Sequence, residues 1–300
     1  MAQLRVLLIG CGDVALRAAR LLSPDFRIYG LTRRGDQHAA LRAAGITPIA
    51  GDLDRRATLD RLRVSPYAVL HCAPPPGAGE DDSRTRNLLA ALTSARSLPR
   101  AFVYVSTSGI YGDCAGARID ETRAPGAESP RARRRVAAES RLRAWSRRSR
   151  VRLSILRAPG IYALDRLPID RLREGTPVLR ADDDVYTNHI HAEDLARACV
   201  AAMFRGLPLR AYNISDDAEL KMGEYFDQVA TALALPRPPR IAREAAARVL
   251  PPVQMSFMRE SRRLLNARAK RDLRWRLLYP TPAALLATIA APAPLAEASR

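Results

Sequence analysis

A short glycine-containing segment near the start of the chain has the residue types needed to bind a phosphate group. The motif Gly-x-Gly-x-x-Ala begins at Gly10, directly after the apolar residues 4–9 and at the start of the helix-patterned residues 13–22. Gly10 permits a tight turn, Gly12 lets the backbone approach a pyrophosphate, and Ala15 lets the helix pack on the strand. The helix N-terminus adds free N–H groups and a positive dipole end. The motif therefore predicts a dinucleotide site, rather than a purely structural turn, at Gly10, Cys11, Gly12, Asp13 and Val14.

The end of the second predicted strand, residues 27–31, distinguishes the two nicotinamide dinucleotides. An NAD site usually has an acidic residue there, which binds the ribose hydroxyls. Here Arg33 and Arg34 follow instead. Two guanidinium groups suit a 2′-phosphate because each can bind it in a bidentate manner, although two solvent-facing arginines would also be ordinary in a chain so rich in arginine. We therefore expect NADP(H) rather than NAD(H).

A regular alternation of strand and helix patterns positions these segments in the first half of the chain. Short apolar or β-branched runs predict strands, and segments of helical periodicity lie between them. Such alternation predicts an α/β fold of the Rossmann type, with a doubly wound parallel sheet and right-handed crossovers. The expected strands are residues 4–9, 27–31, 46–50, 67–72, 101–106 and 151–156, and the expected helices are residues 13–22, 37–44, 54–63, 82–95 and an arginine-rich stretch after residue 130.

The second half of the chain is less regular. Residues 191–204 predict a helix, and residues 211–214 predict a strand that returns to the sheet. We therefore expect a small C-terminal substrate lobe beside the Rossmann-type domain, followed by a partly disordered tail. The predicted division is residues 1–160 with 187–215 for the NAD(P)-binding domain, 161–186 and 216–281 for the smaller lobe, and 282–300 for the Ala/Pro-rich tail.

Two loops that follow predicted strands complete the expected cofactor site. Asp52 and Leu53 come after the third strand, in the usual place for a contact with adenine. Cys72, Ala73 and Pro74 come after the fourth strand, where small residues let the cofactor lie against the chain. Both assignments rest on position alone, because ligands of open α/β sheets bind outside the carboxyl ends of the strands.

The composition argues against several classes of protein. Only Lys221 and Lys270 are lysines, so the net charge of +18 is nearly all arginine, as a GC-rich coding bias produces. Few aromatic residues interleave with the basic ones, so we expect no specific nucleic-acid partner. No signal peptide or membrane-spanning apolar run is present, so we expect a cytoplasmic protein without a membrane partner. No metal site or disulfide is expected either, because the four cysteines are scattered without a CxxC pair: Cys11, Cys72, Cys114 and Cys199.

Four further segments resemble the extended short-chain dehydrogenases/reductases, a group that includes nucleotide-sugar epimerases and dehydratases. Residues 105–112 are similar to the strand and loop of that group that end in Val-Tyr-Gly, and residues 157–162 to its Arg-Pro-x-x-x-Tyr-Gly segment. Residues 188–196 resemble its Phe-Ile-His-Val-Asp-Asp-Val-Ala segment, and residues 212–214 its Tyr-Asn-Ile strand. The resemblance implies an NAD(P) cofactor whose nicotinamide lies against the Arg-Pro segment. That segment adds two residues to the expected cofactor site, Pro159 and Ile161.

The residue pair that transfers protons in this group is absent. Relatives carry Tyr-x-x-x-Lys on the helix after the long loop, with the tyrosine as general acid/base and the lysine holding the nicotinamide ribose and lowering the tyrosine pKa. The aligned positions here hold Arg131 and Arg135. Arginine stays protonated because its pKa is above about 12, so Arg131 cannot replace the tyrosine as a proton donor. It could instead bind an anion or stabilise developing negative charge, and Arg135 could replace the lysine.

Helical spacing supports this alignment independently of the resemblance. Positions 131, 135, 138, 142 and 145 fall on one face of a helix, and that face becomes apolar after its first two members. We therefore expect Arg131 and Arg135 to face inward and Arg133 and Arg134 to be solvated. The alternative is that all four form a surface charge run. The apolar residues of this face are Ala138, Leu142 and Trp145.

Thr107 aligns with the catalytic serine or threonine of this group, and Ser108 is the neighbouring candidate. Either hydroxyl could bind a substrate oxygen, or could simply bond to the backbone at the strand end. Proton transfer would need another group, and Tyr111, Tyr162 and His189 are candidates, although none matches a family acid/base position. The predicted catalytic set is Thr107, Ser108, Arg131 and Arg135.

Two functions fit these observations. The first is an NAD(P)-binding oxidoreductase or epimerase/dehydratase-like enzyme of the atypical extended type, acting on a small anionic or sugar-derived substrate. The second is a catalytically inactive NADP(H)-binding sensor or scaffold, which the lost acid/base pair favours. Relatives often dimerise through the helices beside the long loop, but repulsion between exposed arginines opposes this here, so we expect a monomer or a homodimer. The arginines that favour an acidic substrate are Arg157, Arg166, Arg171 and Arg180.

Overall fold

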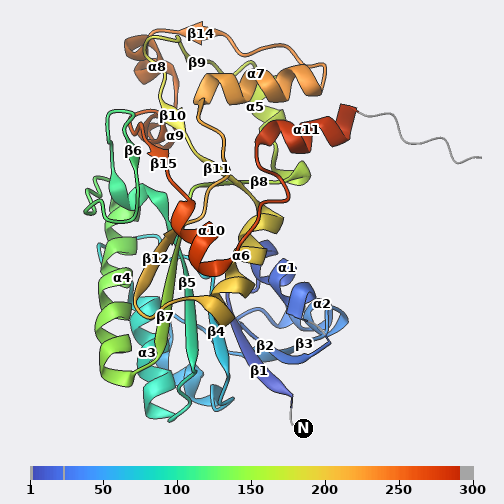
Figure 1. Cartoon of the computed structure of the whole chain (residues 1–300), viewed down its shortest axis with the longest axis vertical. Coiled ribbons are helices and arrows are strands. Elements are labelled where there is room, and N and C mark those ends of the chain that lie inside the picture. Colours follow the sequence, from blue (N-terminus) through green and yellow to red (C-terminus); the bar gives the residue numbers. More distant parts are fainter. Residues whose placement is uncertain (1–2, 23, 291–300) are drawn as a thin grey trace, which may run out of the picture.

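The structure, a computed structural model, describes residues 3–22 and 24–290. Its larger part is a seven-stranded parallel sheet of order β12-β7-β5-β4-β1-β2-β3, with helices on both faces (Figure 1). The chain enters at β1, moves outward to β3, and then returns to fill the other half from β4. This confirms the predicted doubly wound, Rossmann-type α/β fold. The strands are β1 (Leu4–Ile9), β2 (Phe26–Thr32), β3 (Ile46–Ala50), β4 (Ala68–His71), β5 (Ala101–Thr107), β7 (Arg152–Ala158) and β12 (Arg210–Asn213).

Successive residues of the central strands build two separate cores. In β1, Val6 and Leu8 pack on one face of the sheet and Leu7 and Ile9 on the other, and all four are fully buried. A parallel sheet covered on both faces requires such continuous apolar strands. Helices α1 (Asp13–Leu22), α2 (His38–Ala43), α6 (Ala192–Arg205) and α10 (Ala267–Leu273) cover the first face, and α3 (Ser83–Ser94) and α4 (Pro130–Ser149) cover the second.

One predicted helix, residues 54–63, is wrong. Only a 3-10 turn, Arg56–Arg61, forms there. The side chain of Thr58 explains the difference, because its hydroxyl donates toward the carbonyl oxygens of Asp52 and Arg55 and accepts from the Asp52 N–H at 2.8 Å. Such local bonds to the backbone compete with α-helical ones.

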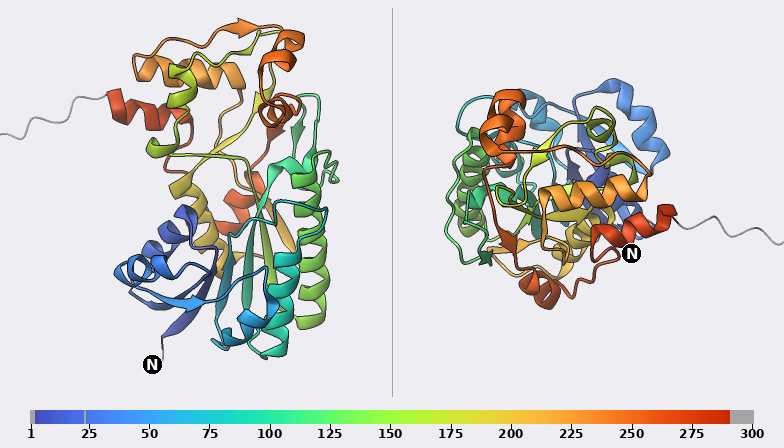
Figure 2. Two further views of the ribbon diagram at one scale, coloured as in Figure 1. Left: turned by 180° about the vertical axis from the view of Figure 1, so that it is seen from behind. Right: turned by 90° about the horizontal axis from the view of Figure 1, so that it is seen from above.

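A smaller lobe lies beyond the carboxyl ends of the strands (Figures 1 and 2). It is joined to the sheet by β8 (Gly160–Tyr162), which pairs in parallel with β11 (His189–His191). Two more pairs, β9 (Val178–Leu179) with β14 (Arg240–Ile241) and β10 (Tyr186–Thr187) with β13 (Leu220–Lys221), support its helices. These are α5 (Ile169–Arg173), α7 (Met222–Ala232), α8 (Arg243–Val249), α9 (Pro252–Phe257) and α11 (Pro282–Ala290).

Two C-terminal segments differ from the expected arrangement. Helix α10, within the range expected for the lobe, packs instead on α6 and β12, because Ala269, Leu273 and Trp275 complete the core of the sheet. The first part of the expected tail is the helix α11, which packs on α7 through Leu286. The rest of the tail, residues 291–300, lies outside the described residues.

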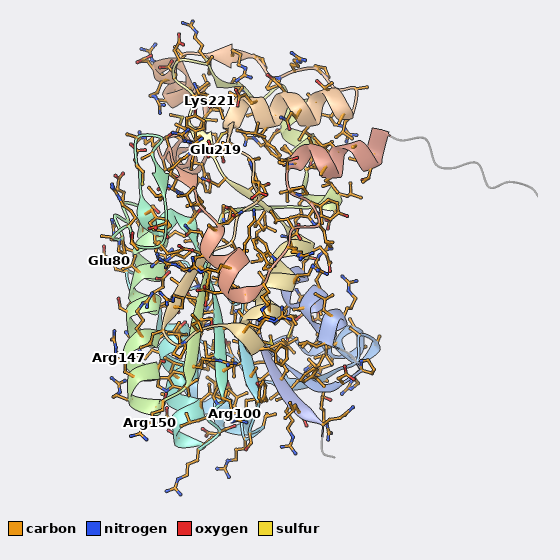
Figure 3. The ribbon with its side chains drawn as sticks, viewed as in Figure 1. Glu80, Arg100, Arg147, Arg150, Glu219 and Lys221 are labelled. Atoms are coloured by element: carbon orange, nitrogen blue, oxygen red, sulfur yellow. The ribbon has the colours of Figure 1, made fainter. Side chains whose placement is uncertain are left out.

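Much of the positive charge projects from the outside of the sheet domain. Figure 3 shows Arg147 and Arg150 at the end of α4, and Arg100 near them, extending away from the ribbon, and all three are exposed. None of the described helices is long and apolar enough to cross a membrane.

Candidate functional site

Three neighbouring cavities follow the carboxyl edge of the sheet. The first, of about 250 Å³, lies beside the ends of β2 and β3. The second, of about 480 Å³, borders the glycine turn, and the third, of about 630 Å³, lies between the sheet and the smaller lobe. Gly10 and Ala73 line the first two, and Thr107 and Arg135 line the second and third. The first two cavities together are lined by every residue expected at the cofactor: Gly10, Cys11, Gly12, Asp13, Val14, Arg33, Arg34, Asp52, Leu53, Cys72, Ala73, Pro74, Arg135, Pro159 and Ile161.

The two glycines of the turn differ in what surrounds them. Gly10 has a φ of +85°, and a Cβ there would lie 2.5 Å from the Ala73 nitrogen, so neither the conformation nor the space admits a side chain. A Cβ on Gly12 would meet no atom within 4 Å, which leaves open space beside the start of α1. Asp13, also at this edge, forms ion pairs with Arg17 at 2.9 Å and Arg166 at 3.2 Å, so its charge is neutralised where phosphates would bind. The residues present therefore fit a dinucleotide.

The arginines after β2 are not equivalent. Arg34 is held by Asp36, with Nη2–Oδ2 at 2.6 Å and Nε–Oδ1 at 3.2 Å. Arg33 is exposed, and it has no carboxylate partner within residues 3–22 and 24–290. Arg84 of α3 also lines this cavity and pairs with Asp54 at 2.8 Å. A role for Arg84 at this cavity was not predicted from the sequence, because no motif marks the start of α3.

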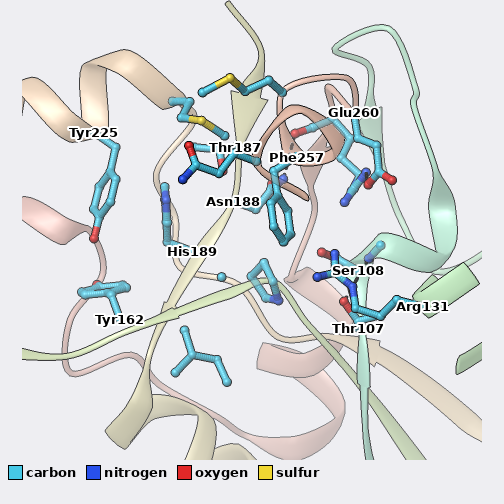
Figure 4. A pocket seen from close by; sticks show the side chains of 18 of the residues that line it. Thr107, Ser108, Arg131, Tyr162, Thr187, Asn188, His189, Tyr225, Phe257 and Glu260 are labelled. Atoms are coloured by element: carbon cyan, nitrogen blue, oxygen red, sulfur yellow. Dashed lines mark hydrogen bonds and ion pairs between the residues drawn. The ribbon is translucent and has the colours of Figure 1, made fainter. Parts of the chain in front are cut away.

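Three of the four predicted catalytic residues lie together at one side of the third cavity: Thr107, Ser108 and Arg131 (Figure 4). Thr107 Oγ1 accepts a hydrogen bond from the Gly109 N–H at 3.2 Å. The sequence analysis considered such a hydrogen bond to the backbone as an alternative to substrate binding. In this bond the Thr107 hydroxyl group is only an acceptor. The hydroxyl proton of Thr107 thus stays free to bind a substrate oxygen.

Arg135 occupies the junction of the second and third cavities. Its Nη1 donates to Tyr104 Oη at 2.9 Å and to the Val105 carbonyl at 2.8 Å, which fixes the guanidinium on one side. Its other N–H groups have no hydrogen-bond partner in the part of the chain that the structure describes. Arg131, one turn earlier, places its guanidinium over the Phe257 ring at 4.5 Å. As expected from the helical spacing, both arginines face the cavities.

The expectation that Arg134 is solvated is wrong. Arg134 is 8% exposed, lines the third cavity and donates to the Gly79 carbonyl at 2.7 Å. The loop before α3 covers the start of α4 here, and its Asp81 also pairs with Arg141 at 2.8 Å. Arg133 stays partly exposed and pairs with Glu80 at 3.2 Å. The helical periodicity of α4 could not reveal this covering loop.

Aromatic and imidazole groups form the opposite wall of the third cavity, where Figure 4 shows Tyr162, His189 and Tyr225. The His189 ring stacks on Tyr225 with centroids 4.1 Å apart, and burial lowers the pKa of His189 to about 4. Burial raises the pKa of the Tyr162 hydroxyl well above its usual range. Neither group therefore exchanges protons readily near neutral pH.

Behind this wall lies a carboxyl group that the sequence analysis did not single out, Asp216. It is 2% exposed, and burial raises its pKa to about 8. The Asp216 carboxyl and the Tyr162 hydroxyl lie close enough to influence each other's pKa. An aspartate in a loop after β12 gives no sequence signal for such burial.

Tyr111 and Arg157, considered from the sequence for proton transfer and substrate binding, are used elsewhere. Arg157 Nη2 lies 2.8 Å from Glu139 Oε2, and Arg157 Nη1 donates to Tyr111 Oη at 2.8 Å. Tyr111 Oη donates in turn to Asn213 Oδ1 at 2.7 Å. This buried network joins α4, β7, β12 and the turn after β5, and none of its residues lines the three cavities. Arg180 is exposed away from them, whereas Arg166 and Arg171 do line the third cavity.

Comparison with known proteins agrees with this geometry. The model of the NAD dependent epimerase/dehydratase family matches residues 16–215. This chain belongs to that family. The segments similar to the extended short-chain dehydrogenases/reductases are thus explained by family membership. Three of them supply three of the four residues of the buried network, Tyr111, Arg157 and Asn213.

Solved structures add the fold and one closer relative. A functionally unknown conserved protein from Silicibacter pomeroyi is 30% identical with a TM-score of 0.78, and the match covers 95% of this chain and 97% of that one. A putative NAD-dependent epimerase/dehydratase from Methylobacillus flagellatus is 26% identical (TM-score 0.73; 97% and 100% covered). UDP-glucuronic acid 4-epimerase from Bacillus cereus, in complex with NAD, shares the fold at 15% identity (TM-score 0.73; 96% and 100% covered). No curated protein matches the sequence.

Proposed function

We propose that this protein is an NADP(H)-preferring oxidoreductase or epimerase/dehydratase-like enzyme that acts on a small anionic or sugar-derived substrate. The observation that carries the proposal is the row of three cavities. It runs from Arg33, past the open space at Gly12, to a substrate-sized cavity lined by Thr107 and Arg135.

Different residues along this row of cavities would bind different groups of the cofactor. Arg33 would bind a 2′-phosphate, the turn at Gly12 would bind the pyrophosphate, and Arg135 would hold the nicotinamide ribose. A bound nicotinamide dinucleotide supplies a hydride donor or acceptor at the junction of the cavities. The protein supplies binding, orientation and charge.

The residues of the third cavity would hold the reacting oxygen of the substrate. Thr107 donates its hydroxyl proton to that oxygen, and Arg131 stabilises negative charge that develops there. Because arginine does not exchange its proton at neutral pH, the proton must move through a group outside α4. The Asp216 carboxyl behind Tyr162 has a pKa near the working range of a general base.

Replacing Gly12 by Val tests the cofactor site directly. A Cβ at this position meets no atom within 4 Å, so we expect the variant to fold, while the new methyl groups occupy the space needed by the pyrophosphate. Calorimetry should then show NADPH affinity reduced by at least about 100-fold, a loss of about 2.7 kcal/mol. Gly35→Val, also in open space but outside the three cavities, is the matched control. Unchanged NADPH affinity in Gly12→Val would remove the site assignment.

Replacing Arg33 by Ala tests the preference for NADP(H). Loss of a phosphate-binding guanidinium should weaken NADPH by about tenfold or more and leave NADH nearly unchanged. Arg34→Ala should have a smaller effect because Asp36 already holds that side chain. Equal losses for both cofactors in Arg33→Ala would show that Arg33 does not bind the 2′-phosphate.

A second candidate function is a non-enzymatic NADP(H) sensor or scaffold, which Arg131 at the tyrosine position favours. A turnover screen with carbonyl and alcohol substrates, in both cofactor oxidation states, separates the two. The enzyme hypothesis expects turnover that falls strongly in Thr107→Ala. Tight cofactor binding without turnover of any substrate would favour the sensor.

A further inference from the structure

The third cavity has an unusual balance of charge. Six arginines line it, against one carboxylate, Glu260. Glu260 pairs with Arg262 at 2.8 Å, and Arg166 pairs with Asp13. Within the described ranges, 3–22 and 24–290, the other four have no carboxylate partner. These are Arg131, Arg134, Arg135 and Arg171.

Three of these four occupy the start of α4, where helix electrostatics disfavours them. The helix begins at Pro130, its N-cap is Ser129, and no acidic residue lies in its first turn. The N-terminus of a helix carries partial positive charge, which repels cations and attracts anions. Arg131, in the first turn, is disfavoured by this charge, whereas Arg134 and Arg135 lie in the second turn, where the effect is weaker. An anion bound at this end of the cavity would compensate both the helix end and the side chains.

The fourth arginine lies on the opposite wall. Arg171 of α5 places its guanidinium over the Phe226 ring at 4.6 Å, and Phe226 contacts Tyr225, which Figure 4 shows across the cavity from Arg131. Two of its nitrogens, Nε and Nη2, are buried without a partner among the described residues. These two atoms have almost no accessible surface, so a ligand in the cavity would be bound through the remaining nitrogen, Nη1, for which no hydrogen-bond partner is found among the described residues.

Arg131 and Arg171 share one arrangement at the two sides of the cavity. Each guanidinium lies against the face of a phenylalanine ring, Phe257 or Phe226. This contact holds the planar group in place. A carboxylate or phosphate in the cavity would be bound through the N–H groups of Arg131 and through Nη1 of Arg171. The cavity of about 630 Å³ between them has room for a small molecule.

We propose that the third cavity binds a substrate with an anionic group at each end, one held by Arg131 and Arg134 at the start of α4 and the other by Arg171 on α5. This inference rests on the proposed function, since it defines the substrate class of the same site. The groups are carboxylates or phosphates, and the uncharged middle of the molecule would lie toward Thr107.

Calorimetry with unreactive probes tests this two-ended binding. The probes are dicarboxylates of increasing length, from malonate to pimelate, with hexanoate as the monoanion and inorganic phosphate as the single-group phosphate probe. All titrations contain saturating NADPH, so that the cofactor arginines are occupied. We expect one dicarboxylate length to bind at least about tenfold more tightly than hexanoate and phosphate.

Variants at both ends provide the second part of the test. Arg131→Gln and Arg171→Gln should each reduce the affinity of the best dicarboxylate to that of hexanoate. Arg148→Gln, an exposed residue of α4, makes the same charge change and should have no effect. Should Arg171→Gln fail to fold, Arg171→Met keeps an apolar contact with Phe226 and serves in its place.

The outcomes separate this inference from the proposed function. NADPH binding without any preference for a dicarboxylate over hexanoate overturns the two-ended site and leaves the cofactor assignment intact. Tight binding of a dicarboxylate that is unchanged in Arg171→Gln also overturns it. Dicarboxylate binding in a protein that shows no heat with NADPH contradicts the proposed function and supports the anion site.

Discussion

Arg157 is buried and Arg171 is partly buried, and the surroundings of the two side chains are opposite. Arg157 is 4% exposed and bonds to both oxygens of Glu139, at 2.8 and 3.3 Å, and to Tyr111. Arg171 lies over an aromatic ring in the third cavity with two buried nitrogens unpaired among the described residues. The charge of Arg157 is balanced by a carboxylate of the chain itself. Arg171 in the third cavity has no such carboxylate among the described residues.

This difference distinguishes a structural role from a binding role. A buried charge needs a partner, and a folded chain that supplies the partner itself gains a rigid connection between its elements. The Arg157 network connects two strands of the sheet with α4 in this way. A region that leaves guanidinium groups without partners is instead prepared for a ligand that brings the negative charge.

The largest expected effect on the free energy of unfolding is at the buried pair of Arg157 and Glu139. Glu139→Gln would leave Arg157 buried without its carboxylate, because both side chains are only 5% exposed. Removing one member of a buried pair typically costs about 3–5 kcal/mol, so the free energy of unfolding in urea should fall by about that amount. Glu219→Gln breaks solvent-accessible pairs with Arg118 and Arg263 and is the control for the same charge change, expected to cost less than about 1 kcal/mol. A similar small loss in Glu139→Gln would mean that this network does not stabilise the fold.

A second prediction concerns Asp216, the buried carboxyl behind the cavity wall. Its pKa is raised from 3.8 to about 8 by burial, next to Asp194 and Asp217 and facing Tyr162. The folded state therefore binds more protons than the unfolded state between these values, and stability falls as pH rises toward 8. Its slope is at most about 1.4 kcal/mol per pH unit.

Buried histidines oppose this trend at lower pH. Burial lowers the pKa of His71, His189 and His191 to about 4, so folded-state stability rises with pH between about 4 and 6.5. The unfolded chain still binds protons at these histidines around pH 6.5, their ordinary pKa, so the two trends overlap. Both proteins contain the histidines, so comparing urea unfolding of the native chain with that of Asp216→Asn isolates the Asp216 effect. The free energy of unfolding of the native chain minus that of the variant should fall as pH rises from about 5 to 8. Parallel curves for the two proteins would refute the raised pKa.

Most of the cofactor edge, Arg84 excepted, could be predicted from the sequence because its residues follow from local rules. Glycine spacing, strand ends and small residues identify Gly10, Gly12 and Ala73 without knowledge of distant contacts. The structure confirms the fold on which those rules depend, and all the expected residues line the first two cavities.

The third cavity could be predicted only in part, because its walls come from segments far apart in the chain. Arg131 and Arg135 follow from helical periodicity, but the burial of Arg134 depends on a loop some fifty residues earlier, at Gly79. Likewise, Arg157 was grouped with Arg171 on residue type alone. Only the position of Glu139 beside Arg157 shows that the two arginines have different roles.

The smallest expected effect on stability is at Arg171. Because no ion pair is broken, Arg171→Gln should change the free energy of unfolding by less than about 1 kcal/mol, the loss of the contact with Phe226 being offset by relief of the unpaired donors. Urea unfolding of this variant beside Glu139→Gln measures the contrast directly. A loss above about 2 kcal/mol in Arg171→Gln would assign that side chain to the folding of the smaller lobe, and the distinction between balanced and unbalanced arginines would fail.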